Sequence, residues 1–222
     1  MTLKALIFDL DGTLVDTAPD LHAATNHVLG LIDRPAISMA ELRSFVGHGA
    51  MNLIERGVAA SGPAVDEKTL KYLHKTFLKY YGDNIADHSV VFDGLPALLD
   101  QAQSAGLKLG VCTNKIENLS RKLLTELGMM QRFGSLVGGD TLPIMKPRPE
   151  PLLEAARLLA VNSNDIMMVG DSETDIRTAQ VANVPVLAVS FGYTSQHVST
   201  FDPTHVIDHY DEAWPIISTY LA

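Results

Sequence analysis

Four aspartates in two close pairs are the residues of this chain best suited to chemistry. Asp9 and Asp11 stand at the end of an apolar run near the N-terminus, and Asp171 and Asp175 follow the apolar run 166–170. Carboxylates that are crowded together repel one another, so such a cluster needs a cation or a shared proton. A metal beside a nucleophilic carboxylate is typical of phosphoryl transfer. We therefore expect a metal centre that handles phosphate.

The spacing of the first pair favours one small ligand. Residues two apart in extended backbone point to the same side, and Gly12 permits a tight turn directly after Asp9 and Asp11. The four aspartates outweigh the one lysine that we place with them, Lys146, so a phosphate dianion would be expelled unless a divalent cation were bound. Oxygen donors favour Mg²⁺ over zinc, which prefers His or Cys ligands.

Short apolar runs supply the elements that must position these residues. Six of them are bounded by Gly, Asp or Pro and lie at 5–10, 108–113, 135–138, 166–170, 186–190 and 205–208. Because they are continuous rather than alternating, and helical stripes separate the later ones, they predict a parallel sheet covered on both faces. One such stripe, Ile176, Ala179 and Val181, ends near Asn183, which tolerates the left-handed cap conformation. The expected fold class is α/β, with a doubly wound, Rossmann-like core.

One connection is too long for an ordinary crossover, which takes one helix and short loops. Between Leu10 and Leu107 no strand-like segment occurs, and helical patterns cover 20–31, 39–45, 50–60 and 67–81. We therefore expect an all-helical lobe, residues 17–86, inserted into a core made of residues 1–16 and 87–222. Linkers near Asp16 and Asp87 would form its hinge.

Polar residues that follow the predicted strands define the candidate site, because ligands of open parallel sheets bind at the carboxyl ends of the strands. Acids, hydroxyls, an amide and lysine converge there. In chain order they are Asp9, Asp11, Thr13, Thr113, Asn114, Lys115, Lys146, Asp171, Ser172 and Asp175.

Composition and charge limit the partners. The net charge of −9 over 222 residues, without a basic cluster, argues against nucleic acid. No segment approaches the ~20 apolar residues that cross a bilayer, and the N-terminus lacks a signal-peptide pattern. The single cysteine, Cys112, lies in an apolar run, which favours a buried structural thiol in a reducing compartment. We expect a cytoplasmic protein with no nucleic-acid or membrane partner, and the oligomeric state stays open.

The ordered motifs resemble those of haloacid-dehalogenase-superfamily phosphatases over nearly the whole chain. The matching segments are Asp9-Leu10-Asp11-Gly12-Thr13-Leu14-Val15-Asp16, Thr113-Asn114, Lys146-Pro147 and Gly170-Asp171-Ser172-x-x-Asp175. The helical insertion resembles the mobile cap of that superfamily. Segments 16–21 and 45–50 are similar to the phosphoglycolate phosphatase branch.

The resemblance implies a role for each acid. Asp9 would be the nucleophile that forms an aspartyl phosphate, and Asp11 would protonate the leaving oxygen and then activate water. Mg²⁺ would be held by Asp9, by the backbone carbonyl of Asp11, by Asp171 and by Asp175, the last either directly or through water.

The remaining site residues would hold the substrate. By the same resemblance Thr113, Asn114 and Lys146 would bind the phosphoryl oxygens, and Lys146 would also keep the nucleophile ionised. On the cap, Gly47 and His48 would admit close approach to the substrate, and Arg43 would reach its carboxylate. The implied activity is Mg²⁺-dependent hydrolysis of a small phosphorylated metabolite, with 2-phosphoglycolate favoured by segment 46–50.

Structural interpretations compete with several of these roles. Thr13 would equally bond the backbone of a turn, Asn114 would cap a helix, and Asp175 would serve a helix dipole. Gly47 would belong to an ordinary helix–helix turn, and Arg43 would be a surface residue. Tyr193 would line the entrance or merely pack.

Two other functions also stay open. A β-phosphoglucomutase-like isomerase uses the same pair of aspartates, although it usually carries Glu-Asp where this chain has Gly170-Asp171, which favours hydrolysis. From another class, a catalytically silent regulatory or binding protein would keep the fold without the reaction.

Overall fold

A six-stranded parallel sheet forms the centre of the computed structural model, which describes residues 2–194 and 196–221. Its strand order is β5-β4-β1-β6-β7-β8, and each neighbouring pair is parallel. The strands are β1 (Ala5–Phe8), β4 (Lys108–Cys112), β5 (Ser135–Val137), β6 (Ile166–Gly170), β7 (Val186–Val189) and β8 (His205–Ile207). The sequence-predicted strands and the α/β fold class are confirmed.

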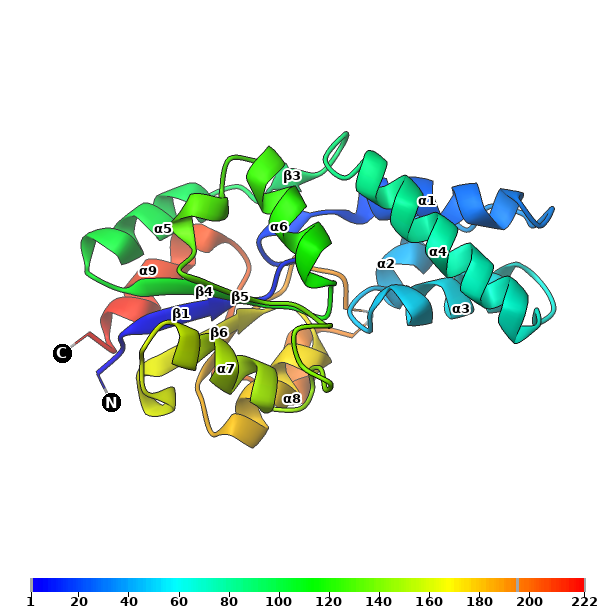
Figure 1. The fold of residues 1–222 in the computed structure, drawn as a ribbon. Coiled ribbons are helices and arrows are strands. Elements are labelled where there is room, and N and C mark those ends of the chain that lie inside the picture. The colour runs from blue at the N-terminus through cyan, green and yellow to red at the C-terminus, as the bar shows by residue number, and fades with distance from the viewer. Residues whose placement is uncertain (1, 195, 222) are drawn as a thin grey trace.

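Helices cover both faces of this sheet (Figure 1). On one face lie α5 (Leu95–Ser104), α6 (Glu117–Glu126) and α9 (Ala213–Ser218), and on the other lie α7 (Glu150–Leu158) and α8 (Glu173–Ala182). Short 3₁₀ turns complete the core at Met130–Arg132, Ser163–Asp165, Val198–Phe201 and Tyr210–Glu212. Among the described residues, no helix combines the length and apolar character needed to span a membrane.

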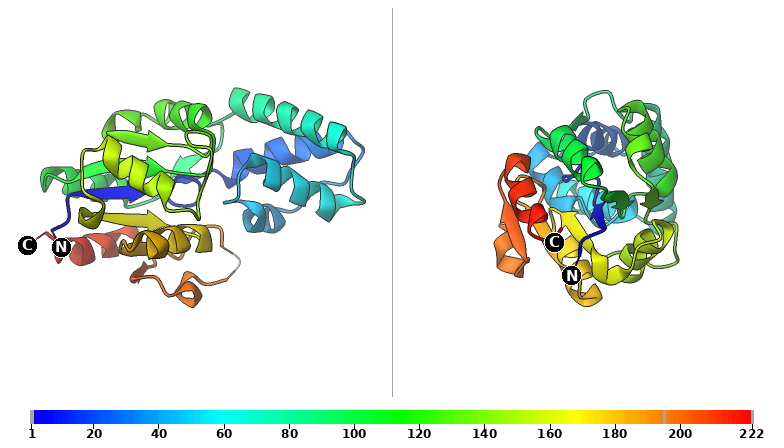
Figure 2. Two further views of the ribbon diagram at one scale, coloured as in Figure 1. Left: turned by 60° about the horizontal axis from the view of Figure 1, so that its bottom comes forward. Right: turned by 90° about the vertical axis from the view of Figure 1, so that its left-hand side faces the viewer.

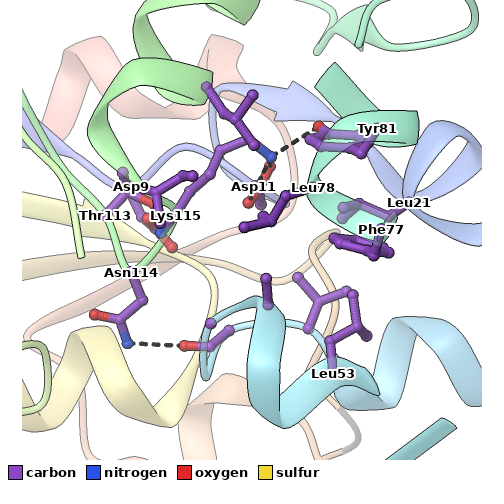
Figure 3. A pocket seen from close by; sticks show the side chains of 16 residues that line it. Asp9, Asp11, Leu21, Leu53, Phe77, Leu78, Tyr81, Thr113, Asn114 and Lys115 are labelled. Carbon is purple, nitrogen blue, oxygen red and sulfur yellow. Dashed lines mark hydrogen bonds and ion pairs between the residues drawn. The ribbon is translucent and has the colours of Figure 1, made fainter. Parts of the chain in front are cut away.

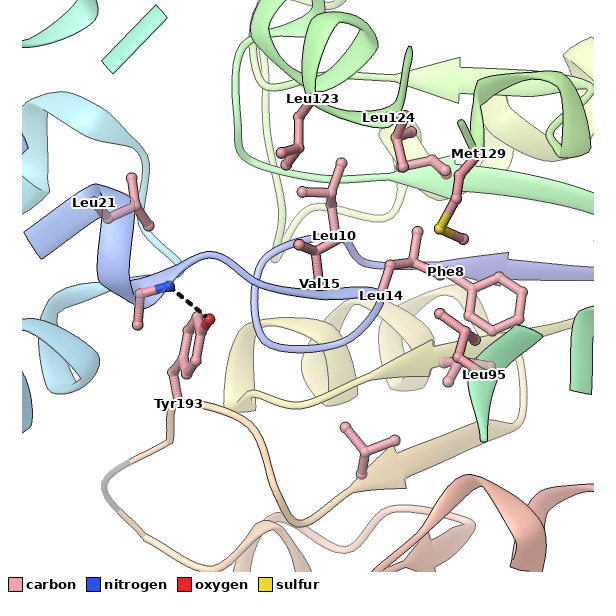
Figure 4. Close-up of a cluster of buried hydrophobic side chains, with 14 of the residues drawn as sticks. Phe8, Leu10, Leu14, Val15, Leu21, Leu95, Leu123, Leu124, Met129 and Tyr193 are labelled. Carbon is pink, nitrogen blue, oxygen red and sulfur yellow. Dashed lines mark hydrogen bonds between the residues drawn. The ribbon is translucent and has the colours of Figure 1, made fainter. Parts of the chain in front are cut away.

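Strand β1 explains why the apolar runs are continuous. Leu6 and Phe8 pack against the α5, α6 and α9 layer, whereas Ala5 and Ile7 pack against α7 and α8. Successive residues of a strand face opposite sides, so a strand buried on both faces is apolar at every position. Figure 4 shows Phe8 within the first of these layers. Truncation of such a side chain to alanine would cost about 3–5 kcal/mol of unfolding free energy.

The helices between β2 (Val15–Asp16) and β3 (Val90–Val91) form a lobe beyond the carboxyl ends of the sheet strands, at the opposite end of the molecule from both termini (Figures 1 and 2). They are α1 (Ala18–Gly30), α2 (Met39–Phe45), α3 (Ala50–Ser61) and α4 (Glu67–Asp83). Local signals fix two of their starts: a capping box of Ser38 and Glu41 begins α2, and the Asp66 side chain accepts from the N–H of Thr69 at 2.7 Å to begin α4.

Two very short strands link the lobe to the core. β2 and β3 pair antiparallel, so the outgoing and returning chains lie side by side. Strands of this length leave no periodic signal in the sequence and were not predicted. The buried carboxylate of Asp20 strengthens the junction, because it accepts from the N–H of Ser89 at 2.8 Å and from its hydroxyl at 2.6 Å.

Two smaller predictions about α8 have opposite outcomes, and a third concerns Cys112. Asn183 adopts the left-handed conformation at the end of α8, with φ of 55°, as predicted. Val181 is 65% exposed and does not belong to the buried stripe, so that part of the prediction was wrong. Cys112 is buried at the end of β4, as expected for a structural thiol.

Candidate active site

The predicted site residues converge at the carboxyl ends of β1, β4 and β6. Asp9 directly follows β1, Thr113 follows β4 and Asp171 follows β6. β1 lies between β4 and β6 in the sheet, so these three chain positions are neighbours. β4 and β5 lie on one side of β1, and β6, β7 and β8 lie on its other side, so the strand order reverses at β1. Open α/β sheets bind their ligands at such a switch point.

Lys146 forms the positive centre of this group. Its ammonium lies 2.9 Å from Oδ1 of Asp9 and 2.6 Å from Oδ1 of Asp175, and its side chain is 1% exposed. Burial alone would lower the pKa of Lys146, but the carboxylates of Asp175 and Asp9 outweigh it and raise that pKa. The lysine therefore stays charged at neutral pH.

Asn114 holds the backbone of Lys146. Its Oδ1 accepts from the N–H of Lys146 at 3.0 Å, and its Nδ2 donates to the carbonyl of Lys146 at 3.1 Å. The same Nδ2 donates to the carbonyl of Gly47 in the cap at 2.9 Å (Figure 3). Helix α6 has Ile116 as its N-cap, so Asn114 does not cap that helix.

Asp9, Asp171 and Asp175 form a buried carboxylate cluster, with one oxygen of each lying within 4.8 Å of the others. Burial, opposed by Lys146, raises the pKa of Asp9 to about 6. Burial and then the charge of Asp175 raise the pKa of Asp171 well above its usual value. Oδ1 of Asp9 is buried and accepts no aligned hydrogen bond from the described residues. Crowded carboxylate oxygens are the donors that a hard cation needs, so this cluster can hold a metal ion.

Two glycines leave the space that the side chain of Asp171 occupies. Gly12 has a φ of +85°, and a Cβ built there would lie 2.5 Å from Oδ2 of Asp171. A Cβ on Gly192 would lie 2.2 Å from Cβ of Asp171. Hydrogen bonds orient the carboxylate, with the Thr13 hydroxyl donating to Oδ1 at 2.9 Å and the N–H of Tyr193 donating to Oδ2 at 2.8 Å. Thr13 therefore acts through Asp171.

Asp175 has its oxygens occupied by the protein. Oδ2 accepts from the N–H and the hydroxyl of Ser172 at 3.1 and 2.6 Å, which forms the capping box of α8. Oδ1 accepts from Lys146 at 2.6 Å. Asp175 therefore closes the first turn of α8, as well as belonging to the carboxylate cluster.

Asp11 lies apart from the carboxylate cluster and faces the cap. Its Oδ1 accepts from the hydroxyl of Thr17 at 2.7 Å and from the ammonium of Lys115 at 3.0 Å. Lys115 also donates to the hydroxyl of Tyr81 in α4 at 2.7 Å, as Figure 3 shows. Lys115 was predicted to lie at the site, because it follows the second predicted strand, but the sequence indicated no partner for it.

Two cavities meet at Asp9 and Asp11. The first is mostly apolar and lies against α4 and α6, where Lys115 is a lining cation (Figure 3). Its apolar lining comes from Leu21, Val46, Leu53, Phe77, Leu78, Ile116 and Leu119. The second is polar, and its lining includes Asp171, Ser172, Glu173, Tyr193, His48 and Arg56. Gly47 borders both cavities, so the cap loop that was predicted to approach substrate does lie at the site.

Arg43 lies instead at the junction between the helical lobe and the core. Its guanidinium contacts both carboxylate oxygens of Asp16, at 3.2 and 3.0 Å, and its carbon is 4.9 Å from the ring centroid of Tyr193. Neither cavity includes Arg43 in its lining. The hydroxyl of Tyr193 donates to Asp16 at 2.6 Å and accepts from the N–H of Ala18 at 2.9 Å (Figure 4). These contacts depend on tertiary packing and leave no sequence signal.

A family model of haloacid dehalogenase-like hydrolases matches residues 6–189. The chain belongs to this family. A phosphoglycolate phosphatase of Mesorhizobium japonicum is 43% identical over 211 residues, which are 95% of this chain and 93% of the relative. That of Caulobacter vibrioides is 40% identical over 91% of this chain and 85% of its own. The crystal structure of a predicted phosphoglycolate phosphatase from Haemophilus somnus has a TM-score of 0.92 at 29% identity, covering 97% of this chain and 98% of that one.

These likenesses confirm the resemblance drawn from the motifs. Together with the carboxylate cluster, they show that this haloacid dehalogenase-like hydrolase is a phosphatase. The interpretation as a catalytically silent binding protein is thereby set aside.

Proposed function

We propose that this phosphatase hydrolyses 2-phosphoglycolate with Mg²⁺, through an aspartyl phosphate formed on Asp9. The observation that carries the proposal is the position of Asp9, which belongs to the carboxylate cluster, touches the ammonium of Lys146 and borders both cavities. The substrate is suggested by the names of the curated relatives.

In the first step an oxygen of Asp9 attacks phosphorus and the bond to the ester oxygen breaks. Asp11 gives its proton to the leaving oxygen, so the alcohol departs neutral. In the second step water attacks the phosphorus of the aspartyl phosphate and gives a proton to Asp11. The Asp9–phosphorus bond breaks, phosphate leaves, and both acids return to their starting forms.

Asp9, Asp171 and the backbone carbonyl of Asp11 would hold Mg²⁺, and Asp175 would orient the group through Lys146. The bound ion would neutralise charge on the phosphoryl oxygens. Asp175 is then a supporting residue, because Lys146 and Ser172 already occupy both of its oxygens.

The phosphoryl oxygens would be held by Lys146 and Thr113. The Thr113 hydroxyl accepts from the N–H of Lys115 at 3.2 Å, which leaves its proton to donate to substrate. The side-chain amide of Asn114 is already bonded to Lys146 and Gly47, so we assign it to positioning these two groups.

Local space favours hydrolysis over the mutase alternative. A Cβ on Gly170 would lie 2.4 Å from Cβ of Asp175, so the glutamate that mutases usually carry at this position does not fit.

The residues 17–86 are proposed to act as a cap that excludes bulk water, with its hinge near Asp16 and Asp87.

Steady-state kinetics on purified protein test this function. We expect phosphate release from p-nitrophenyl phosphate that depends on Mg²⁺ and is lost in Asp9→Asn, and a higher kcat/KM for 2-phosphoglycolate than for other small monoesters. Activity retained by Asp9→Asn would remove the proposed nucleophile. Equal kcat/KM across the panel would remove 2-phosphoglycolate while leaving the phosphatase, and isomerisation of a sugar phosphate without free phosphate would favour the mutase.

A further inference from the structure

The polar cavity poses an electrostatic problem for any substrate with a second negative charge. Its core side carries Asp9, Asp11, Asp171 and Glu173. A metal ion and Lys146 would balance the phosphoryl group, but a carboxylate further along the substrate would still face an acidic wall. It therefore needs a cationic partner on the cap side.

Arg43 is not available for that task. It is paired with both oxygens of Asp16 and lies over the ring of Tyr193, and it lines neither cavity. Lys115 lines the apolar cavity, but its ammonium is engaged by Asp11 and Tyr81. A carboxylate placed among the leucines of that cavity would lose its hydration without gaining a partner.

Arg56 meets the requirement. It projects from α3 into the lining of the polar cavity, and no ion pair or hydrogen bond engages its side chain within residues 2–194 and 196–221. Its guanidinium carbon lies 4.8 Å from the ring centroid of Phe45, the last residue of α2. A cation–π contact of this kind restrains the guanidinium and leaves its N–H groups free to donate hydrogen bonds.

We propose that Arg56 recognises the carboxylate of the substrate, by hydrogen bonds from its guanidinium within the polar cavity. This inference rests on the proposed function, because it names the group that selects phosphoglycolate-type esters. Arginine presents paired N–H donors that match the two oxygens of a carboxylate, which neither the cap loop at Gly47 nor the exposed His48 supplies.

Paired substrates isolate this contact. 2-Phosphoglycolate and 2-hydroxyethyl phosphate have similar size and differ in the carboxylate. For Arg56→Gln we expect kcat/KM on 2-phosphoglycolate to fall about 10- to 150-fold, the loss typical of hydrogen bonds to a charged group, and kcat/KM on the neutral ester to change less than about 2-fold. Arg56→Lys should recover part of the preference. Arg121→Gln, an exposed arginine paired with Glu117 on α6, is the matched control and should leave both values unchanged.

A binding measurement keeps the test independent of turnover. Calorimetric titration of the Mg²⁺-loaded protein would compare 3-phosphonopropionate, which keeps the carboxylate, with propylphosphonate, which lacks it. Wild type should bind the first more tightly, and Arg56→Gln should bind both alike. Unfolding curves of each variant would establish that the fold is intact.

The possible outcomes separate this inference from the proposed function. An equal loss on both esters, or no loss on either, overturns the role of Arg56 even if 2-phosphoglycolate is the preferred substrate. If wild type prefers another anionic ester, the substrate proposal fails, and the same comparison with 3-phosphoglycerate and glycerol 3-phosphate decides the role of Arg56. If wild type binds 3-phosphonopropionate no more tightly than propylphosphonate, the role of Arg56 is overturned as well.

Discussion

The ammonium of Lys115 lies 3.0 Å from Oδ1 of Asp11, at the junction of the sheet and the helical lobe. Both side chains are largely buried, with 7% and 13% exposure. The hydroxyl of Tyr81, which belongs to the lobe, lies 2.7 Å from the same ammonium. The lobe thus reaches the proposed acid–base residue both through the hydroxyl of Thr17 and through Tyr81 and Lys115, so the position of the lobe and the charge beside Asp11 are structurally coupled.

Removal of this lysine should slow the reaction. In Lys115→Met, Asp11 loses the cation that orients its carboxylate, and we expect kcat to fall about 10-fold or more, a part of the 10²–10⁴ that acid–base catalysis contributes. The loss should be larger on an alkyl ester than on p-nitrophenyl phosphate, whose leaving group needs little protonation. Tyr81→Phe, which keeps the ring, serves as the milder companion. Wild-type kcat in Lys115→Met on both esters would show that the ion pair is only structural.

The metal-free protein should lose stability as pH rises through the acidic range. Burial raises the pKa of Asp9 from 3.8 to about 6. Between these two pKa values the folded protein keeps a proton on Asp9 that the unfolded chain has lost. The contribution of this proton to the free energy of unfolding is therefore full below the unfolded-state pKa and is lost as the pH rises through the folded-state pKa. The difference corresponds to roughly 3 kcal/mol at most.

Urea unfolding in EDTA would measure this slope. The free energy of unfolding of wild type should fall between about pH 4 and about pH 6.5, and Asp9→Asn should show a flatter dependence because it removes the titrating group. Parallel curves for the two proteins would contradict the assignment of this slope to Asp9.

The sequence was sufficient for the sheet and for most of the carboxylate cluster, and the reason is local. Parallel strands buried on both faces must be apolar throughout, and a charged residue that ends such a run must lie at the carboxyl edge. The positions of Asp9 and Asp171 could therefore be predicted from the apolar runs that directly precede them in the sequence. Lys146 needed only the additional expectation that the third strand ends beside the first two.

The cap contacts could not be predicted in this way. Arg43 and Asp16 are 27 positions apart, and Tyr193 and Asp16 are 177 apart, so their contacts depend on how the lobe packs on the core. A surface arginine and a hinge arginine have the same sequence pattern. The same holds for Arg56, whose place in the cavity follows from the packing of α3 beside α2.

Metal binding should stabilise the fold, because only the folded chain brings Asp9, Asp171 and Asp175 together. For wild type at a Mg²⁺ concentration of about 100 times Kd, we expect the free energy of unfolding to increase by about 2.7 kcal/mol. Asp171→Asn should lose most of this increase. Glu173→Gln is the matched control, since Glu173 lines the polar cavity but lies outside the carboxylate cluster. Equal stabilisation of Asp171→Asn and wild type would place the ion elsewhere.

The hydroxyl of Tyr193 should contribute to stability where the lobe joins the core. It donates to Asp16 at 2.6 Å and accepts from the N–H of Ala18 at 2.9 Å, while its ring supports the guanidinium of Arg43. Tyr193→Phe keeps the ring but removes both hydrogen bonds of the hydroxyl, and it leaves the N–H of Ala18 with only the longer contact to Oδ1 of Asp16 at 3.3 Å. We therefore expect a loss of about 1–3 kcal/mol in the free energy of unfolding.

Chemical denaturation of Tyr193→Phe and of Tyr72→Phe provides the comparison. Tyr72 is 57% exposed on α4, so removal of its hydroxyl should change the free energy of unfolding by less than about 0.5 kcal/mol. Because the N–H of Tyr193 also donates to Asp171, loosening of this residue should weaken Mg²⁺ binding in the same variant. A stability loss with unchanged Mg²⁺ affinity would confine Tyr193 to the hinge, whereas a loss of both would establish that the hinge and the carboxylate cluster are coupled through it.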